Sequence, residues 1–422
     1  MAKKNFFRAF FIMSILFSFL MKVAFILFRK TYLNVELFEY EDAAQSMVKG
    51  EGFKNIFLGT TYYAPVHPFY PFVCSLVYRM NGSHLAVLVL QAAISTLLGL
   101  SVYWLGRRLF SPLVSWVACM LTLFHPALWV YTTLKLHSLV FDASWFVIIL
   151  LSFMTLKESL SAARSFWTGV VSGLACLSRS TLGPFILFGT YWVMWQWRRK
   201  VPLRYLIVCT TLVLFAAFLV VVPWLIRNEK RLGHPIGIVS LFGLNLWLGN
   251  NPVASGSAYT PDGKRVLDFM PKEMSQRLGS LTEWEQNELF KEEALRFMKT
   301  HPRRTLILFW KKWFAFWWRF PQTGVQYPKM WSRIYTFYYL ILLWVAMGGM
   351  MYTLFSKVHL RVDVVLILML FFLVSMVQSL FFVEGRHRWA VEPVLLIFSA
   401  EGLRLVWSKT KALCAGFAVR SA

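Results

Sequence analysis

The chain has 422 residues, of which 58% are hydrophobic and 18% aromatic, while only 15% are charged. Soluble domains carry roughly 25% charged residues, so this composition excludes an ordinary soluble domain and predicts an all-α integral membrane protein. The formal net charge of +24 does not indicate nucleic-acid binding, because the basic residues mostly flank long apolar runs and form no solvated patch.

The first apolar run follows a basic start and covers residues 6–28. It is too long for the apolar core of a signal peptide and lacks a small-residue cleavage site, so we expect a retained span. Residues 166–197 are long enough for two short spans interrupted at "SRSTLGP". The remaining runs of span length are 85–105, 112–132, 137–156, 204–226, 335–356, 362–383 and 389–407. Together they predict about ten transmembrane helices with a partly helical external loop region.

Basic residues in short loops set the expected orientation, because cytoplasmic loops carry an excess of lysine and arginine. With a cytoplasmic N-terminus, basic residues recur in every inner connection, as at 107–108, 157–164, 198–204, 357–361 and 409–411. Both termini are then cytoplasmic, and the polar segments lie on the external side.

This orientation predicts three parts of the chain. An N-terminal transmembrane module (1–226) includes a first external loop (29–84) that we expect to be catalytic. An external loop (227–334) carries surface and interfacial helices, and a C-terminal transmembrane module (335–422) contains the short turn 383–388.

Two helices are expected in the second external loop. Thr282 and Glu285 have the spacing of a capping box, and the helix they begin should end before Pro302. The following "RRTLILFWKKWFAFWWRF" combines tryptophans with Lys311, Lys312 and Arg319. Aromatic and cationic side chains together favour the membrane interface, either as an anchor or in contact with an anionic lipid substrate.

The first external loop contains "ELFEYEDAAQSMVKGEGF", in which an acid, Tyr, Ala, Met and Gly follow one another at positions 36, 40, 44, 47 and 50. This pattern resembles the first external loop of the C-type membrane glycosyltransferases that use polyprenyl-phosphate sugars. The protein mannosyltransferases and the lipid A aminoarabinose transferase belong to this group. Further segments resemble the family in the same order along the chain: "HPFYPFVCSLVYRMNG", "SGLACLSR", "PWLIRN", "GLNLWLGNNPVASG", "EEALRFMKTHP" and "RHRWAVEP".

The resemblance implies an inverting enzyme that moves a sugar from a polyprenyl-phosphate donor to an acceptor hydroxyl. An acceptor hydroxyl is a weak nucleophile, so a carboxylate within hydrogen-bond reach should take its proton. On the resemblance, Glu36 is the first candidate base and Asp42 the second. Glu36 replaces the family's usual Asp, and the alternative is that these acids only solvate or cap a helix.

Cations near the leaving phosphate should lower the barrier. The candidates are Arg227, at the outer end of a span, and Arg386 and Arg388 in the turn before the last span, although a boundary arginine is often only an anchor. Arg179 lies in an apolar region, where a charge requires a partner or a wet cavity, and we expect a structural ion pair.

Further substrate-binding residues follow from the resemblance and from the glycine-rich segment 243–256. The resemblance gives Tyr40 and His67, the latter at a position where an arginine is common. Asn245 and Asn250 carry amides that can bind sugar hydroxyls or phosphate, or merely shape a loop. His67, His137 and His387 show no fixed ligand spacing, so we assign no metal and no other cofactor, although a divalent metal is not excluded.

The sequence thus predicts a glycosyltransferase in a bacterial-type inner membrane, with its active site on the external face. Its expected partners are the lipid-linked donor, a glycan, lipid or protein acceptor, and the bilayer, with no nucleic acid. The alternatives are a multi-span transporter, a flippase or a polysaccharide ligase. Only one interrupted helix pair is found near 179–184, whereas transporters often contain two.

Overall fold

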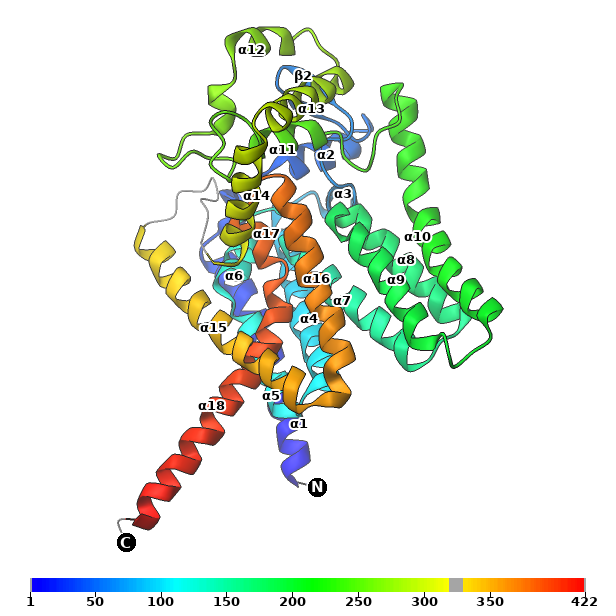
Figure 1. Cartoon of the computed structure of the whole chain (residues 1–422). Helices are drawn as coiled ribbons and strands as arrows, with labels where there is room; N and C mark the ends of the chain where they lie inside the picture. Colours follow the sequence, from blue (N-terminus) through cyan, green and yellow to red (C-terminus); the bar gives the residue numbers. More distant parts are fainter. Residues whose placement is uncertain (1, 319–328, 421–422) are drawn as a thin grey trace.

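The computed structural model describes residues 2–318 and 329–420, and nearly all of them are helical or lie in short connections (Figure 1). The predicted all-α architecture is therefore confirmed for this part of the chain. Within it, a single antiparallel hairpin pairs β1 (Asn55–Phe57) with β2 (Thr60–Tyr62). Residues 319–328, including Arg319, lie outside the described residues.

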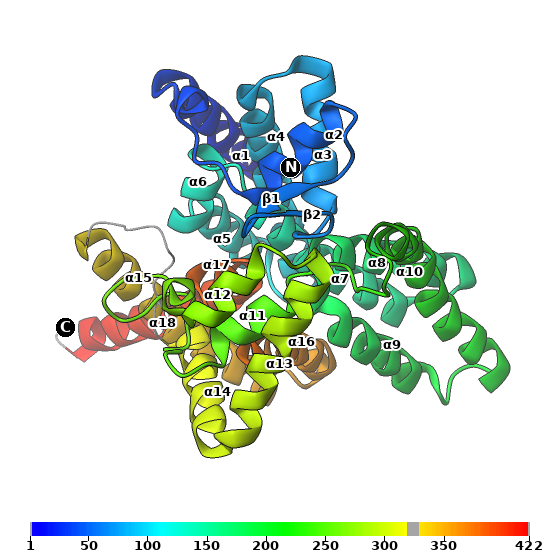
Figure 2. The same cartoon turned by 90° about the horizontal axis from the view of Figure 1, so that it is seen from above.

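Long helices form a bundle, with the two chain termini at the same end (Figure 1). These helices are α1 (Ala2–Phe28), α4 (His84–Leu109), α7 (Leu139–Glu158), α10 (Leu203–Leu232), α15 (Lys329–Ser356), α16 (Arg361–Leu380) and α18 (Glu392–Arg420). Shorter helices complete the bundle: α3 (Phe69–Asn81), α5 (Pro112–Leu123), α6 (Pro126–Thr133), α8 (Ala162–Ser178) and α9 (Gly183–Trp197). Figures 1 and 2 both show α8, α9 and α10 grouped on one side.

Six of the described helices are long and apolar enough to cross a membrane, and the pair α5–α6, bent by 48°, raises the number to seven if it is one span. The predicted count of about ten spans is therefore not confirmed. Two of the predicted spans that are too short are α8 and α9, which have 17 and 15 residues, whereas a span needs about 20. The predicted interruption between them is confirmed, because η2 (Ser180–Leu182) separates the two helices.

A cap covers one end of the bundle and is built from residues 39–62 and 242–300, which belong to the two long segments predicted as external loops. Its elements are α2 (Glu39–Val48), the β1–β2 hairpin, α11 (Phe242–Gly249), η3 (Val266–Phe269), α12 (Lys272–Leu278) and α13 (Glu283–Thr300). The predicted capping box is confirmed, because Thr282 and Glu285 form it at the start of α13. Figure 2 shows α11, α12 and α13 lying over the bundle.

A buried carboxylate joins the two halves of the cap. Glu283, at the start of α13, accepts hydrogen bonds from the backbone N–H groups of Tyr63 at 2.5 Å and Ala64 at 3.0 Å. Next to it, the Tyr62 hydroxyl donates to the Gln286 side chain at 2.5 Å. Residues more than 200 positions apart in sequence are thereby held in one layer.

Short elements connect the cap and the bundle: η1 (Thr31–Leu33), α14 (Pro302–Trp317) and α17 (Gly385–Trp389). A further short element, η4 (Val358–Leu360), joins α15 to α16. In α14, Lys312 is 1% exposed. Its ammonium group donates to the carbonyl of Gly249 and the side chain of Asn250 at 3.2 Å, and to the carbonyl of Leu380 at 3.4 Å. One lysine thus satisfies carbonyls at the C-terminal ends of α11 and α16.

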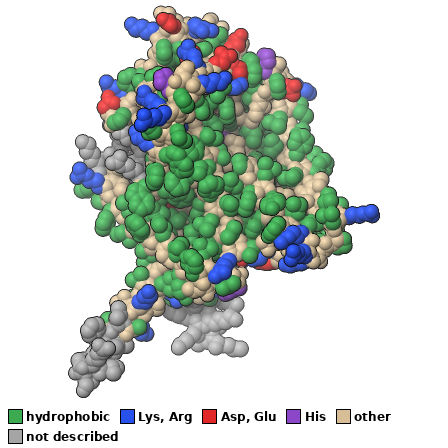
Figure 3. Space-filling model, in the orientation of Figure 1, with side chains coloured by type: hydrophobic (Ala, Val, Ile, Leu, Met, Phe, Trp, Pro, Cys, Tyr) green, Lys and Arg blue, Asp and Glu red, His purple; other side chains and the backbone are tan. Residues whose placement is uncertain are grey.

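The surface has the pattern expected of a multi-pass membrane protein. Figure 3 shows hydrophobic side chains over the middle of the molecule, with acidic and basic side chains on the cap and mostly basic ones at the opposite end. Helices that face lipid keep apolar side chains outward, because unpaired polar groups are costly there. The side of a membrane that the cap occupies remains a prediction.

Close packing of α15 against α18 can be tested with two neighbouring glycines. A Cβ atom at Gly349 would collide with the backbone carbonyl of Phe398, whereas one at Gly348 has open space. We expect Gly349→Ala to lower the free energy of unfolding by about 1–3 kcal/mol, the usual cost of overpacking. The measurement is the thermal midpoint in detergent. Gly348→Ala is the matched control, and an equal loss in both variants would contradict this packing.

Candidate active site

A cavity of about 430 Å³ lies between the cap and the bundle. It is lined by residues from α2, from the loop before α3, from α7, from the α8–η2 junction, from α11 and from the α16–α17 turn. The charged and histidine side chains among the lining residues are Glu39, His67, His137, Asp142, Arg179, Arg386 and His387. Segments that are far apart in sequence thus supply one polar site at the end of an apolar bundle.

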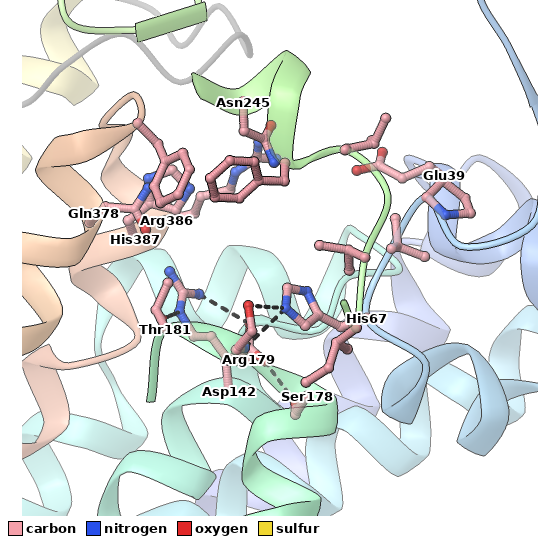
Figure 4. A pocket seen from close by; sticks show the side chains of 18 of the residues that line it. Glu39, His67, Asp142, Ser178, Arg179, Thr181, Asn245, Gln378, Arg386 and His387 are labelled. Carbon is pink, nitrogen blue, oxygen red and sulfur yellow. Dashed lines mark hydrogen bonds and ion pairs between the residues drawn. The ribbon is translucent and has the colours of Figure 1, made fainter. Parts of the chain in front are cut away.

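An ion pair forms the lower side of the cavity in Figure 4. Arg179 lies 3.3 Å from Asp142, measured between the guanidinium and carboxylate groups. Asp142 also accepts hydrogen bonds from Ser178 at 2.8 Å and Ser138 at 3.0 Å. The partner predicted for Arg179 is therefore confirmed, and both carboxylate oxygens of Asp142 accept hydrogen bonds, as a charge in an apolar bundle requires.

A second guanidinium, that of Arg386 in α17, lies on the opposite side of the cavity from Glu39 (Figure 4). The buried carboxylate of Glu384 lies 3.1 Å from Arg386. The backbone N–H of Glu384 also donates to His387 Nδ1 at 3.1 Å, as part of a capping box that begins α17. The sequence "EGRHR" therefore forms a rigid turn that holds one cation at the cavity.

Glu39 is the first residue of α2, and its exposed carboxylate has no hydrogen bond or ion pair with the described residues. Its backbone carbonyl accepts a hydrogen bond from Asn55 at 3.2 Å, which fixes the start of the helix. The neighbouring Tyr40 hydroxyl accepts a hydrogen bond from Ser138 at 3.4 Å. A free carboxylate is thus presented to the cavity by a tethered helix end.

Four of the residues predicted to bind substrate line this cavity, namely Tyr40, His67, Asn245 and Arg386. Figure 4 shows Asn245 on α11 above the space between Glu39 and Arg386. Their sequence positions span the chain, so the cavity brings together the first external loop, the second one and the turn before the last helix, as the sequence predicts.

The two predicted catalytic acids are not among the lining residues. Glu36 forms an ion pair with Lys135 at 3.0 Å, and its backbone is bridged to the same residue. Asp42 is exposed on α2 and likewise does not line the cavity. Glu36 and Arg227 therefore do not line one cavity with Arg386, because Lys135 binds Glu36 and backbone carbonyls bind Arg227.

Arg227 connects parts of the cap to the end of α10. It donates hydrogen bonds to the carbonyls of Phe53, at 2.8 Å, and Tyr63. Its guanidinium also lies 4.7 Å from the ring centroid of Trp224. These contacts hold the cap to α10, and Arg227 does not line the cavity.

Asn250 and Arg388 are also held in internal contacts away from the cavity lining. Asn250 donates to the carbonyls of Leu246 and Leu380, both at 2.8 Å. Arg388 donates to the Glu392 carboxylate at 2.6 Å. The alternative of a loop-shaping role for Asn250 fits this geometry, and Arg388 belongs to a buried ion pair inside the bundle.

Sequence reasoning did not place Glu39 or Asp142 at the cavity. Asp142 carried a usable signal, because an ionisable residue inside an apolar helix is a functional candidate by default. Glu39 carried none, since several acids surround it and only the helix start at Phe38 and Glu39 decides which one faces the cavity. In the described residues, no group of three His, Cys, Asp or Glu side chains is placed to hold a metal ion.

Residues 64–226 match the family model described as dolichyl-phosphate-mannose-protein mannosyltransferase. The structure is similar to the archaeal oligosaccharyltransferase AglB from Archaeoglobus fulgidus in complex with an inhibitory peptide and a dolichol-phosphate, with a TM-score of 0.55 and 14% identity. The resemblance to the C-type membrane glycosyltransferases is confirmed. The family match includes four of the charged or histidine residues of the cavity, His67, His137, Asp142 and Arg179.

The alignment with AglB covers 97% of this chain and 52% of that one, so this chain spans about half the length of AglB. A second structure of the Archaeoglobus fulgidus enzyme, tethered to an acceptor peptide containing the NVT sequon, gives a TM-score of 0.55 at 15% identity. It covers 95% of this chain and 50% of that one. No curated protein matches. At this identity the likeness shows that this chain shares its fold with that part of AglB.

His67 gives a test of the cavity in which pH is the variable. The pKa of His67 is lowered to about 3, because burial disfavours the charged ring and Arg179 repels it. The unfolded chain takes up this proton near pH 6.5, so the stability that the neutral ring contributes is present above that pH and is lost as the pH falls. Between pH 7.5 and 5.5 we expect this residue to reduce the free energy of unfolding by about 1.4 kcal/mol.

The measurement compares thermal midpoints in detergent at the two pH values for the unsubstituted protein and for His67→Gln. The glutamine oxygen can still accept the hydrogen bond that the Ser180 N–H donates to His67 Nε2 at 3.0 Å. The variant should therefore lose less stability on acidification. If both proteins lose the same amount, His67 is not held neutral in the folded state.

Proposed function

We propose that this protein is a membrane glycosyltransferase that moves a sugar from a polyprenyl-phosphate donor to an acceptor hydroxyl. The observation that carries the proposal is the free carboxylate of Glu39 facing the guanidinium of Arg386 across one cavity (Figure 4). Sugar transfer with inversion needs a base on one side of the anomeric carbon and a site for the departing phosphate on the other.

The proposed base is Glu39. It takes the proton of the acceptor hydroxyl as the oxygen attacks the anomeric carbon, while the bond to the lipid phosphate breaks. Glu36, the first candidate from the resemblance, is less well placed because its carboxylate is bound by Lys135. A carboxylate without a competing cation is the better proton acceptor in a ternary complex.

Arg386 is the proposed partner of the leaving phosphate. Charge accumulates on the phosphate as the glycosidic bond breaks, and a guanidinium already held in place stabilises it without reorganising. Glu384 orients Arg386 through the 3.1 Å ion pair. The amide of Asn245, on the upper side of the cavity, can donate to a sugar hydroxyl or a phosphate oxygen.

The lipid-linked donor is supported by the position of the cavity at the end of an apolar bundle. A polyprenyl chain can then remain in the bilayer while its headgroup reaches the polar residues. The family description names dolichyl-phosphate-mannose, and the AglB structure holds a dolichol-phosphate. We propose that the cap faces the outside of a bacterial-type inner membrane and that both termini are cytoplasmic, because basic residues gather at the end opposite the cap.

Replacement of Glu39 tests the base. Glu39→Gln keeps the size of the side chain and removes the proton acceptor, so we expect kcat for sugar transfer to fall by roughly 10²- to 10⁴-fold. The assay is the release of polyprenyl phosphate from a panel of polyprenyl-phosphate sugars by purified protein in detergent. The matched control is Asp42→Asn, on the same helix but outside the cavity, which should stay close to the unsubstituted enzyme.

Glu36→Gln tests whether the base is Glu39, as we propose from the structure, or Glu36, as the resemblance alone implies. It should reduce transfer far less than Glu39→Gln does, provided that both variants elute from size exclusion as the unsubstituted protein does. If Glu39→Gln is fully active and Glu36→Gln is inactive, the base is Glu36 and the assignment to Glu39 is wrong. Solute movement in sealed vesicles without cleavage of any donor would favour the transporter alternative.

A further inference from the structure

A second pocket lies on the cap, and the proposed mechanism does not use it. Its volume is about 640 Å³, and it is lined by residues from three segments, 60–63, 231–234 and 282–285. These segments are the β2 region, the end of α10 and the start of α13. Sites for small ligands commonly enclose roughly 300–1,000 Å³, so this space, which we call the cap pocket, is large enough to hold one.

Part of the lining forms a frame whose polar groups are already hydrogen-bonded within the protein. Glu283 accepts hydrogen bonds from the backbone N–H groups of residues 63–64, at 2.5 and 3.0 Å. Thr282 and Glu285 bind each other in the capping box of α13. Thr60 donates to a backbone carbonyl just before α13 at 3.1 Å. These contacts hold the pocket in shape, so a ligand meets a preformed site, which favours binding.

The other side chains with polar atoms in the lining are not bound by the protein itself. They make no side-chain hydrogen bond and no ion pair with the described residues, and they are Thr61, Tyr63, Arg231, His234 and Trp284. The guanidinium of Arg231 lies 6.0 Å from the ring centroid of Tyr63. The rings of His234 and Trp284 are stacked, with centroids 4.7 Å apart and planes 14° apart. The cap pocket thus combines flat aromatic rings with unused donors and acceptors.

This combination suits a sugar. The C–H face of a pyranose packs on an aromatic ring, while its hydroxyl groups exchange hydrogen bonds with arginine, threonine and tyrosine side chains. The ionisable groups other than Tyr63 in the lining are Arg231, His234, Glu283 and Glu285. Two carboxylates balance the guanidinium and the imidazole even when the imidazole is protonated. The pocket therefore favours a neutral sugar over an anionic ligand.

The cap pocket and the cavity are neighbours. Both the loop before α3 and the chain that follows α10 line first one and then the other. Tyr63 lines the pocket and Pro65 lines the cavity, and residues two positions apart are separated by at most about 7 Å. The backbone N–H of Ser240 donates to the carbonyl of Ala64 at 2.8 Å, which joins the two shared segments.

The cap pocket is connected to the side of the cavity that carries Glu39. Asn55 donates to the carbonyl of Glu39 at 3.2 Å and pairs with Tyr62 in the β1–β2 hairpin. Tyr62 directly precedes Tyr63, a lining residue of the pocket. Arg386, the proposed partner of the leaving phosphate, lies on the opposite side of the cavity (Figure 4). A molecule held in the cap pocket would therefore reach the cavity from the side of the proposed base.

We propose that the cap pocket binds a neutral sugar of an oligosaccharide acceptor, while another sugar of the same chain brings its hydroxyl to Glu39. This inference rests on the proposed function and names the acceptor class as a glycan. Trp284 supplies a flat ring for the sugar face, and Arg231 supplies hydrogen-bond donors for its hydroxyl groups.

The binding test uses neutral trisaccharides of mannose, glucose and galactose. Their dissociation constants are measured for the purified full-length protein in detergent, without a donor. The trisaccharide that binds best should bind roughly 10-fold more weakly to Trp284→Ala and to Arg231→Ala, because each variant loses one contact. Trp284→Phe keeps a flat ring and should retain most of the affinity.

The matched control is Lys230→Ala. Lys230 is exposed on α10 next to Arg231 but does not line the pocket, so this variant should bind as the unsubstituted protein does. Thermal midpoints show whether each variant is folded. Arg231 is exposed, so Arg231→Ala keeps the test decisive even if Trp284→Ala is unstable.

A kinetic test separates binding of the acceptor from the chemical step. With a trisaccharide acceptor, Trp284→Ala should raise KM roughly 10-fold and change kcat less, because the reacting groups in the cavity are untouched. With the corresponding monosaccharide, which is too short to occupy both spaces, the increase in KM should be smaller.

Equal affinity of all variants for the trisaccharides, or no binding of any neutral trisaccharide, would overturn the assignment. Tighter binding of trigalacturonate, which is anionic, would also overturn it, as would Trp284-dependent binding of a serine- and threonine-containing peptide but of no sugar. Release of polyprenyl phosphate from a donor by the unsubstituted protein would leave the proposed function intact in each case. Failure to release it from any donor would instead count against the proposed function itself.

Discussion

The ion pair between Asp142 and Arg179 is the interaction on which the site depends, because it allows polar chemistry at the end of an apolar bundle. Neither charge could remain alone in this position, since an isolated charge among membrane helices is costly. Paired at 3.3 Å and supported by Ser138 and Ser178, they close the bundle below the cavity. The break between α8 and α9 places Arg179 at this point, so the chain interruption and the ion pair form one structural unit.

Above that pair, the site is completed by segments that reach it through the cap. The buried Glu283 joins the β1–β2 region to α13, and the carbonyls bound by Arg227 hold the same region to α10. With the first external loop fixed in this way, α2 presents Glu39 to the cavity. The residues that hold these segments are charged, yet they bind backbone groups and do not line the cavity. The charged residues thus have two kinds of position. Glu283 and Arg227 hold segments of the chain together, whereas Glu39 and Arg386 line the cavity.

The difference between these two kinds of charged residue explains which features of the fold and of the site could be predicted from the sequence. Apolar runs of span length gave the helical membrane architecture, and the Thr282–Glu285 spacing gave the start of α13, because both depend on local sequence. The meeting of Tyr40, His67, Asn245 and Arg386 followed from topology and from the family pattern. The internal contacts of Arg227, Asn250 and Arg388 did not follow, because an arginine or asparagine that binds backbone carbonyls or a buried acid looks in sequence like one that binds substrate. The choice between Glu36 and Glu39 depends on Lys135, which lies about a hundred residues away in the chain.

The contacts of Lys312 link α14, a helix with an exposed apolar face, to two helices that lead to the cavity. Its helix, α14, exposes Leu306, Ile307 and Phe314 on one face, while the lysine on the other face binds the ends of α11 and α16. Helix α11 carries Asn245, and α16 leads into the turn that carries Arg386. A tilt or a vertical shift of α14 in response to membrane thickness would therefore move both sides of the cavity together. Lipid composition would then change the shape of the cavity without any lipid entering it.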